Sequence, residues 1–337
     1  MNNQSPRVSV VMSVYNGETY LRKAVDSILN QTFTEFEFIV VDDASTDGTA
    51  RILTEYARRE PRIHLLSNSI NLGLARSLNR ALEQASGRYV ARMDADDISL
   101  PFRLEKQLAF MEKHPEVGVL GTAVELIDSA GQVTGQRIYP LDPIVICWRL
   151  AFENPLCHPT AMIRQYLLQG VQYNPDLTTA QDYDLWCQLG SQIRFANIPE
   201  PLLRFRKHGT NLTYQKGGQQ RTNSLHISRK YLEHSLKMPA PDEVVSYLWD
   251  RQRLSPKQAL EIVNLMGKFA RVMLVETGWT TLERKVLRRH AACWIYERAR
   301  NGFSDPLAWQ IVYKAVNLDP LGMLQRLLGW LIPIKTL

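Results

Sequence analysis

The chain has no long apolar run, few cysteines and no low-complexity segment. No stretch reaches the roughly 18 apolar residues that a transmembrane helix needs, so we expect no membrane span. The four cysteines, Cys147, Cys157, Cys187 and Cys293, show no CxxC spacing, which favours buried thiols in a reducing cytoplasm over disulfides. The N-terminus lacks a basic segment followed by an apolar one, so we also expect no signal peptide.

The net charge is slightly negative over the first two thirds of the chain and clearly positive over the last third. Residues 1–220 hold 22 Lys and Arg against 24 Asp and Glu, whereas residues 221–337 hold 18 against 10. The cluster Arg284, Lys285, Arg288 and Arg289 belongs to this basic region. A basic helical face can contact an anionic membrane surface or an acidic polymer, or can simply be solvated. No nucleic-acid-binding motif accompanies the charge, so we expect no nucleic-acid partner.

Apolar runs in the first hundred residues alternate with helical patterns. Strands are predicted at residues 8–14, 36–41, 63–66 and 87–91, with an amphipathic helix after each of the first three. The runs are continuous rather than alternating, which is typical of strands buried on both faces of a parallel sheet. At 337 residues the chain is long enough for about two domains. The sequence therefore predicts an α/β protein with a doubly wound, mostly parallel sheet.

Three carboxylates crowd together where the fourth predicted strand ends. Asp94, Asp96 and Asp97 fall within four residues, and like charges this close disfavour each other's ionisation. Mg²⁺ or Mn²⁺ relieves that conflict and prefers carboxylates together with substrate phosphates. The pattern therefore indicates a site for a metal-bound diphosphate, with a solvated acidic turn or a helix N-cap as the alternative interpretation.

Other polar side chains follow the first two predicted strands. Tyr15 follows the first, and Asp42 and Asp43 follow the second. Because ligands of such sheets bind outside the carboxyl ends of the strands, we expect these residues to lie at one edge with the acidic cluster.

Several motifs resemble one known family. They are Val-Ser-Val-Val-Met-Ser-Val-Tyr-Asn-Gly (8–17), Val-Val-Asp-Asp-Ala-Ser-Thr-Asp-Gly-Thr (40–49), Asn-Leu-Gly-Leu-Ala-Arg-Ser-Leu-Asn (71–79), Met-Asp-Ala-Asp-Asp (93–97), Gln-Asp-Tyr-Asp-Leu-Trp (181–186) and Phe-Arg-Lys-His-Gly-Thr-Asn-Leu-Thr (205–213). In order and spacing they are similar to the family 2 glycosyltransferases of GT-A fold, over about residues 6 to 215.

The resemblance implies an inverting, metal-dependent transferase. It would move a sugar from a nucleotide diphosphate sugar, with UDP-sugars favoured, to a glycan or glycolipid hydroxyl in cell-surface polysaccharide synthesis. The catalytic domain would span residues 1–220, with a nucleotide-sugar half to about 100 and an acceptor half beyond it. An α-helical region would follow at 221–337. The enzyme would act in the cytoplasm, and its basic region could contact the inner face of the membrane.

The resemblance also suggests roles for individual residues. The nucleotide-sugar contacts would be Ser13, Tyr15, Asn16, Asp42, Asp43, Asn71, Arg76, Asp94, Ala95 and Asp96. Mn²⁺ or Mg²⁺ would be held by Asp96, Asp94 and His208, and the acceptor side would be shaped by His158, Trp186 and Arg206. Within these sets, Tyr15 could stack on the base and Arg76 could pair with phosphate, although an ordinary surface arginine is the alternative for Arg76.

The resemblance places the general base at Asp182. The sequence around it predicts a helix start, where a carboxylate can also act merely as a cap, and Asp184 is the second candidate. Two other functions remain open at this point, a nucleotidyltransferase on a similar sheet and a non-catalytic sugar-nucleotide-binding scaffold.

The C-terminal region is predicted to be helical. Helices are expected from Pro256, across 281–301, from Pro306 and from Pro320. The last of these is so apolar that it should pack on the domain, form a dimer interface or enter a membrane surface.

Overall fold

A computed structural model describes residues 6–190, 192–209, 217–249, 255–276, 278–299, 306–320 and 322–323 of the chain. These residues form two compact units. The first unit comprises Met1–Leu141 and Asn154–Ser224, and the second comprises Asp142–Glu153 and Leu225–Leu337. The second unit thus takes a short segment from the middle of the chain as well as the C-terminal part.

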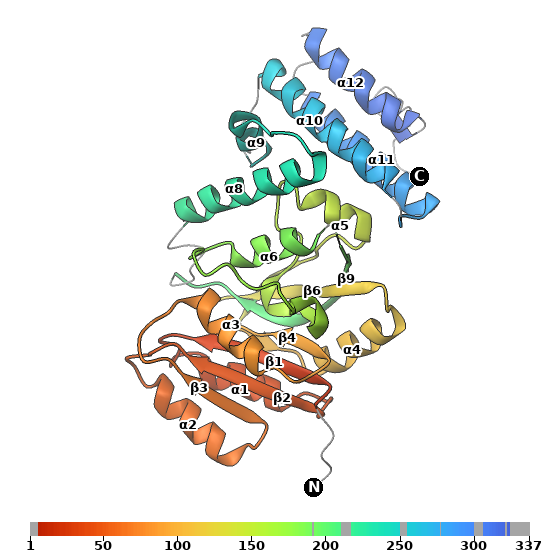
Figure 1. Ribbon diagram of the computed structural model, residues 1–337. Helices are drawn as coiled ribbons and strands as arrows, with labels where there is room; N and C mark the ends of the chain where they lie inside the picture. Colours follow the sequence, from red (N-terminus) through yellow and green to blue (C-terminus); the bar gives the residue numbers. More distant parts are fainter. Residues whose placement is uncertain are drawn as a thin grey trace. The chain divides into compact units, whose positions relative to one another are not determined.

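The first unit is built on one mixed sheet whose described strands have the order β3-β2-β1-β4-β8-β6-β9-β5, with β7 paired to β6 (Figure 1). The first four strands in this order are parallel. Their bounds are β1 Val8–Val14, β2 Phe36–Asp42, β3 Ile63–Ser67 and β4 Tyr89–Arg92. The predicted doubly wound, mostly parallel sheet is therefore confirmed.

Helices cover both faces of this parallel half. The crossovers are α1 (Leu21–Leu29), α2 (Thr49–Arg59) and α3 (Leu74–Gln84). Val10 and Met12 of β1 pack with α1 and α2 on one face, while Val11 packs near Ala81 of α3 on the other. Burial on both faces explains why the strands are continuous apolar runs in the sequence.

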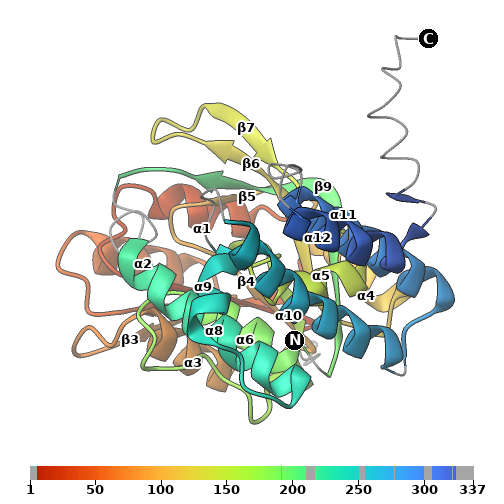
Figure 2. The same ribbon diagram turned by 90° about the horizontal axis from the view of Figure 1, so that it is seen from above.

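The second half of the sheet joins antiparallel and parallel strands. Its elements are β5 Ile98–Ser99, α4 Arg103–Lys113, β6 Val117–Ile127, β7 Val133–Arg137, η1 His158–Thr160, β8 Met162–Arg164, η2 Gln165–Leu168, α6 Gln181–Leu189 and β9 Arg194–Arg206. β8 pairs antiparallel with both β4 and β6, and β9 pairs parallel with β6 and antiparallel with β5. Figure 2 shows β6 and β7 running together as a hairpin.

The second unit is helical. Its helices are α5 Pro143–Arg149, most of α8 Gly217–Leu236, α9 Asp242–Trp249, α10 Pro256–Val275, α11 Thr281–Ala299 and α12 Pro306–Leu318. α10 begins as predicted, with Pro256 at its first position and a capping box between Ser255 and Gln258. Side chains of α10, α11 and α12 share one apolar core that includes Val263, Ile295 and Ile311.

Part of the predicted last helix lies outside the described residues. Among the described residues, no helix combines the length and apolarity that a membrane crossing requires.

Candidate active site

The carboxyl ends of β1, β2 and β4 meet at one edge of the sheet. β1 lies between the other two strands and is parallel to both. The Asp43 N–H donates to the Val14 carbonyl (2.9 Å), and the Met93 N–H donates to the Val11 carbonyl (3.0 Å). The loops that carry Tyr15, Asp42 and Asp94 therefore leave the sheet side by side, as the sequence predicts.

Two adjacent carboxylates at the end of β2 have different surroundings. Both are buried, but the Asp43 carboxylate accepts from the Asn68 side chain (2.6 Å) and from the N–H groups of Leu72 and Gly73 (both 2.8 Å). Asp43 thus holds the loop that leads into α3. Asp42 accepts a hydrogen bond from the Ser45 N–H at 3.1 Å. Because Asp43 is already saturated by protein donors, Asp42 is the better placed of the two for a ligand.

The remaining residues expected to contact the nucleotide lie at the same edge of the sheet and range from buried to exposed. Ser13 is buried in β1, whereas Tyr15 after it is 50% exposed. Asn71 and Arg76 are exposed, and Nη2 of Arg76 lies 3.7 Å from Oδ1 of Asp176. A Cβ added at Gly17 would lie 3.8 Å from the Cβ of Ala95, so the loop after β1 runs beside the acidic cluster.

Asp94, Asp96 and Asp97 form one cluster, in which the candidate ligand oxygens lie within 4.8 Å of one another. Burial and the neighbouring Asp94 raise the pKa of Asp96. Burial, Asp96 and Asp94 raise the pKa of Asp97 well above its usual value. One Asp97 oxygen, Oδ2, is buried without a hydrogen-bond partner among the described residues.

A divalent cation fits this cluster. Oxygens on opposite sides of Mg²⁺ lie about 4.2 Å apart, so three carboxylates this close need little movement to share one ion. His208 lies beside the same cluster, because its Nε2 is 2.8 Å from Oδ2 of Asp96. The structure thus brings together all three residues expected to hold the metal, and Asp97 of the predicted acidic cluster lies with them.

Arg206 ties the end of β9 to the acidic cluster. Its side chain is fully buried, donates from Nε to the Asp96 carbonyl (2.7 Å), and lies over the Tyr20 ring. Its Nη1 donates to the carbonyls of Asp128 and Ser129, and its backbone N–H donates to Oδ1 of Asp97 (2.8 Å). Arg206 therefore holds the backbone of the cluster rather than presenting its charge to solvent.

Arg92, the last residue of β4, is a buried cation beneath the same cluster. It is 1% exposed and forms an ion pair with Asp94. Its Nε and Nη2 have no hydrogen-bond partner among the described residues. A buried charge needs compensation, and here the nearby carboxylates supply it.

Asp182 lies in the first turn of α6, where the sequence places it. Its Oδ2 accepts from the Asn154 amide at 2.6 Å. Burial raises the pKa of Asp182, while the Tyr183 N–H, the Asn154 amide and the Arg92 charge act in the opposite direction. Burial outweighs these contacts, so the pKa of Asp182 lies above its usual value.

His158 and Trp186 are core residues behind this region. His158 is 8% exposed, and its Nε2 lies 2.8 Å from the Tyr173 hydroxyl. Burial and the charge of Arg92 lower the pKa of His158 well below its usual value, which leaves a neutral imidazole at pH 7. Trp186 is fully buried, edge-on to His158 and to Phe195. Its contacts are those of packing.

Sequence reasoning assigned no role to Arg92, Asn154 or Tyr173, whereas Asp97 was predicted as part of the acidic cluster. Arg92 carried a weak signal, a charged residue at the end of an apolar strand. Asn154 and Tyr173 carried none, because only the fold brings Asn154 to Asp182, 28 residues away, and Tyr173 to His158, 15 residues away.

A GT-A sheet with an acidic cluster at its carboxyl edge defines the class, a glycosyltransferase, and comparisons with known proteins agree. The model of glycosyl transferase family 2 matches residues 9–169. EpsE of Bacillus subtilis (strain 168) is 42% identical over 210 residues, which cover 61% of this chain and 74% of EpsE. The O-antigen biosynthesis glycosyltransferase WbnJ of Escherichia coli is 33% identical over 205 residues, which cover 60% of this chain and 80% of WbnJ.

Among solved structures, S. aureus TarS 1-349 in complex with UDP-GlcNAc aligns with a TM-score of 0.59 at 19% identity, over 96% of this chain and 92% of TarS. At that identity the likeness concerns the fold. The chain belongs to glycosyl transferase family 2, and the protein is an enzyme of that class.

Proposed function

We propose that the protein is an inverting, metal-dependent glycosyltransferase that moves a sugar from a nucleotide diphosphate sugar to a hydroxyl of a glycan or glycolipid. The observation that carries this proposal is the cluster of Asp94, Asp96 and Asp97, with His208 against Asp96, at the carboxyl edge of the sheet. Its relative WbnJ is named for O-antigen biosynthesis, which supports a role in polysaccharide synthesis. None of the four cysteines forms a disulfide, in keeping with action in the cytoplasm.

The donor would lie across the ends of β1, β2 and β4. Tyr15 would stack on the base, with Ser13 and Asn16 beside it, and Asp42 would accept from a ring N–H. Arg76 and Asn71, at the start of α3, would face the ribose and phosphates together with Asp94 and Ala95. A UDP-sugar is favoured because the structural neighbour TarS was solved with UDP-GlcNAc.

Asp96, Asp94 and His208 would hold Mn²⁺ or Mg²⁺, and Asp97 adds an oxygen to the same cluster. When bound, the cation supplies a Lewis acid that takes up charge on the departing diphosphate. Arg206 donates to the Asp96 carbonyl and so fixes the backbone that carries the carboxylates.

Asp182 would remove the proton of the acceptor hydroxyl. It must be ionised to do so, and the Asn154 hydrogen bond and the Arg92 charge favour the ionised form against burial. His158 and Tyr173 pack near this group as a neutral hydrogen-bonded pair. The acceptor half of the catalytic domain, from about residue 101 to 220, would supply the cleft.

One carboxylate base on the acceptor side implies a single in-line displacement, so an α-linked donor would give a β-linked product. NMR of the anomeric proton in the first-formed product tests this directly. Net retention would overturn the inverting mechanism and leave the family assignment intact.

A donor screen tests the proposal as a whole. UDP-, GDP-, TDP- and CMP-sugars are added with and without Mn²⁺, and thermal midpoints are compared, since a ligand of the native state raises its apparent stability. One diphosphate-sugar class should raise the midpoint, and only when Mn²⁺ is present. No stabilisation by any of them would contradict the proposed function.

The helical unit would contact an anionic surface. A groove of about 940 Å³ between α10, α11 and α12 is lined by Arg271, Arg288 and Lys314 beside the apolar Leu274 and Leu318. None of the described residues that line it is acidic. Phosphate headgroups would complement these cations.

Sedimentation with phosphatidylglycerol vesicles tests this contact. Arg271→Glu with Lys314→Glu should abolish binding. Lys257→Glu with Lys268→Glu, at two exposed residues of α10 outside the groove, makes the same change in net charge and should weaken binding only slightly. Equal losses in both proteins would mean that net charge, not the groove, governs the contact.

A further inference from the structure

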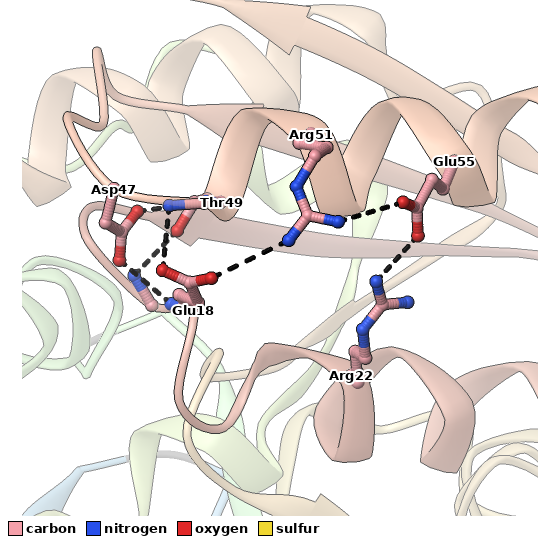
Figure 3. Close-up of polar contacts among 8 residues, drawn as sticks. Glu18, Arg22, Asp47, Thr49, Arg51 and Glu55 are labelled. Atoms are coloured by element: carbon pink, nitrogen blue, oxygen red, sulfur yellow. Dashed lines mark hydrogen bonds and ion pairs between the residues drawn. The ribbon is translucent and has the colours of Figure 1, made fainter.

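The two loops that follow β1 and β2 hold one another by reciprocal hydrogen bonds. The first loop contributes Asn16, Gly17 and Glu18, and the second contributes residues 45–49. We call this set of contacts the loop clasp. It is made between backbone N–H groups of one loop and side chains of the other, in both directions (Figure 3). The side chains of Ser45, Asp47 and Thr49 have no role in the active site as proposed above.

Three contacts run from the first loop to the second. The Asn16 N–H donates to Oγ of Ser45 (3.0 Å), and the Gly17 N–H donates to Oγ1 of Thr49 (2.9 Å). The Glu18 N–H donates to Oδ2 of Asp47 (3.1 Å). Three successive N–H groups of one loop are thus satisfied by three side chains of the other.

Two contacts run in the opposite direction. The Thr46 N–H donates to Oδ1 of Asn16 (2.8 Å), and the Gly48 N–H donates to Oε2 of Glu18 (2.9 Å). A Cβ at Gly48 would lie 2.2 Å from a Glu18 carboxylate oxygen, so any larger residue there would displace this carboxylate from its hydrogen bond. The clasp therefore depends on residues of both loops.

Both loops are also held in an unfavourable backbone conformation. Asn16 has φ 52° and Ala44 has φ 60°, in the left-handed region that non-glycine residues rarely adopt. Such positions persist where surrounding contacts over-determine them, and they gather at ligand sites. Burial raises the pKa of Asp47, but hydrogen bonds from Thr49 and Glu18 outweigh it and lower the pKa overall. The clasp thus restrains the backbone of the loops and stabilises the ionised form of Asp47.

The clasp joins the two residues that would recognise the base. Ser45 accepts from the Asn16 N–H, next to Tyr15, while its own N–H donates to Asp42 (3.1 Å). One serine therefore connects the stacking residue with the hydrogen-bonding residue of the proposed nucleoside pocket.

We propose that the loop clasp is a positioning device for the nucleobase, which holds Tyr15 and Asp42 in place before the donor binds. This inference rests on the proposed function. A pre-ordered pocket avoids the ordering cost on binding, so opening the clasp should weaken the binding of a nucleoside diphosphate. It should not weaken the binding of diphosphate alone, because the acidic cluster and His208 are not part of it.

Thr49 offers a matched pair of variants, because its side chain is fully buried and carries both a hydroxyl and a methyl group. Thr49→Val keeps the shape and removes the acceptor of the Gly17 N–H. Thr49→Ser keeps that acceptor and removes the methyl group. A packing role would make the serine variant the worse of the two, whereas the clasp makes the valine variant worse.

Isothermal titration with UDP and with inorganic diphosphate, both in Mn²⁺, measures the effect. For Thr49→Val we expect UDP to bind about tenfold more weakly, as the loss of a buried hydrogen bond allows, and diphosphate to bind within twofold of wild type. Thr49→Ser should match wild type for both ligands. Thr54→Val is the control, since the Thr54 hydroxyl donates to the Ala50 carbonyl of its own helix (2.8 Å) rather than to either loop.

Two results would overturn the inference. UDP affinity of Thr49→Val within twofold of wild type would show that the clasp does not order the pocket. Equal losses for UDP and for diphosphate would show a general effect on the site. Ser45→Ala gives the same comparison if Thr49→Val does not fold. Failure of the wild-type protein to bind UDP, or GDP in its place, would instead contradict the proposed function itself.

Discussion

At the candidate active site, individual residues of opposite charge compensate one another. Asp94, Asp96 and Asp97 crowd three carboxylates together, and Arg92 and Arg206 are the buried cations that face them. Removing one partner of a buried pair leaves an uncompensated charge, which is costly. Each of these residues therefore affects its neighbours' protonation as well as their position.

Arg92→Met should move the acid limb of the pH–rate profile to higher pH. The positive charge of Arg92 lowers the pKa of Asp182, so its removal raises that pKa. Because the base must be ionised, activity would then be lost at a higher pH as the solution is acidified. Arg92→Lys keeps the charge and should keep the limb near its wild-type position. If the acid limb of Arg92→Met does not move, the charge of Arg92 does not influence the pKa of Asp182.

Asp182→Asn should cost roughly 10²–10⁴ in kcat, which is the range for a general base. Asparagine keeps the volume and much of the hydrogen bonding, so the affinity for the donor should barely change. Asp184→Asn, two residues along the same helix, is the matched control and should retain most activity. If the effects are reversed, Asp184 is the base.

At the scale of elements, the sequence was sufficient for the parallel half of the sheet. β1 and β2 are continuous apolar runs with clear breaks, and each predicted strand from residue 8 to 91 overlaps an observed one. The second half was not predictable in this way. β6 pairs with β9, so that Val117 lies beside Arg194, and the register shifts along the pair. Such long-range pairing leaves no periodic signal in either segment.

The same distinction holds for the site. The acidic cluster could be recognised because its members lie within four residues of the sequence. The contacts of Asp97 with Arg206 and of Asp96 with His208 join residues 109 and 112 positions apart. The position of His208 was expected only from the family resemblance. Asp43 was expected at the nucleotide, but its role in holding Leu72 and Gly73 needed the structure.

The end of β9 offers an element-scale test. Arg206→Lys cannot reach the Asp96, Asp128 and Ser129 carbonyls together, because lysine lacks the planar fork. We expect a loss of about 3 kcal/mol in the free energy of unfolding, since hydrogen bonds to charged groups contribute about 1.5–3 kcal/mol each.

Mn²⁺ affinity should fall as well in Arg206→Lys, because the backbone of Asp96 loses its tether. Arg204→Lys is the control two residues earlier. Arg204 pairs with Glu125 near the surface, and exposed pairs contribute about 0.2–1 kcal/mol. Urea denaturation and Mn²⁺ titration check both variants, and equal behaviour of the two would contradict the tether.

At the scale of the whole molecule, each of the two units has its own core and its own chemistry. The first carries the acidic cluster and the proposed base, and the second carries the basic groove.

Hydrogen exchange should show a response to the ligand in the first unit and none in the second. UDP with Mn²⁺ should slow exchange in the loops after β1, β2 and β4, because these face the ligand. It should leave α10, α11 and α12 unchanged, and protection confined to those helices would contradict the site.

The central claim, metal-dependent transfer through Asp96, is tested most directly by nucleoside diphosphate release from the donor that the screen identifies. Wild-type protein with Mn²⁺ should release the diphosphate in the presence of acceptor, EDTA should abolish the release, and added Mn²⁺ should restore it. Asp96→Ala should be inactive under all three conditions. Undiminished release by metal-free wild-type protein would contradict the account.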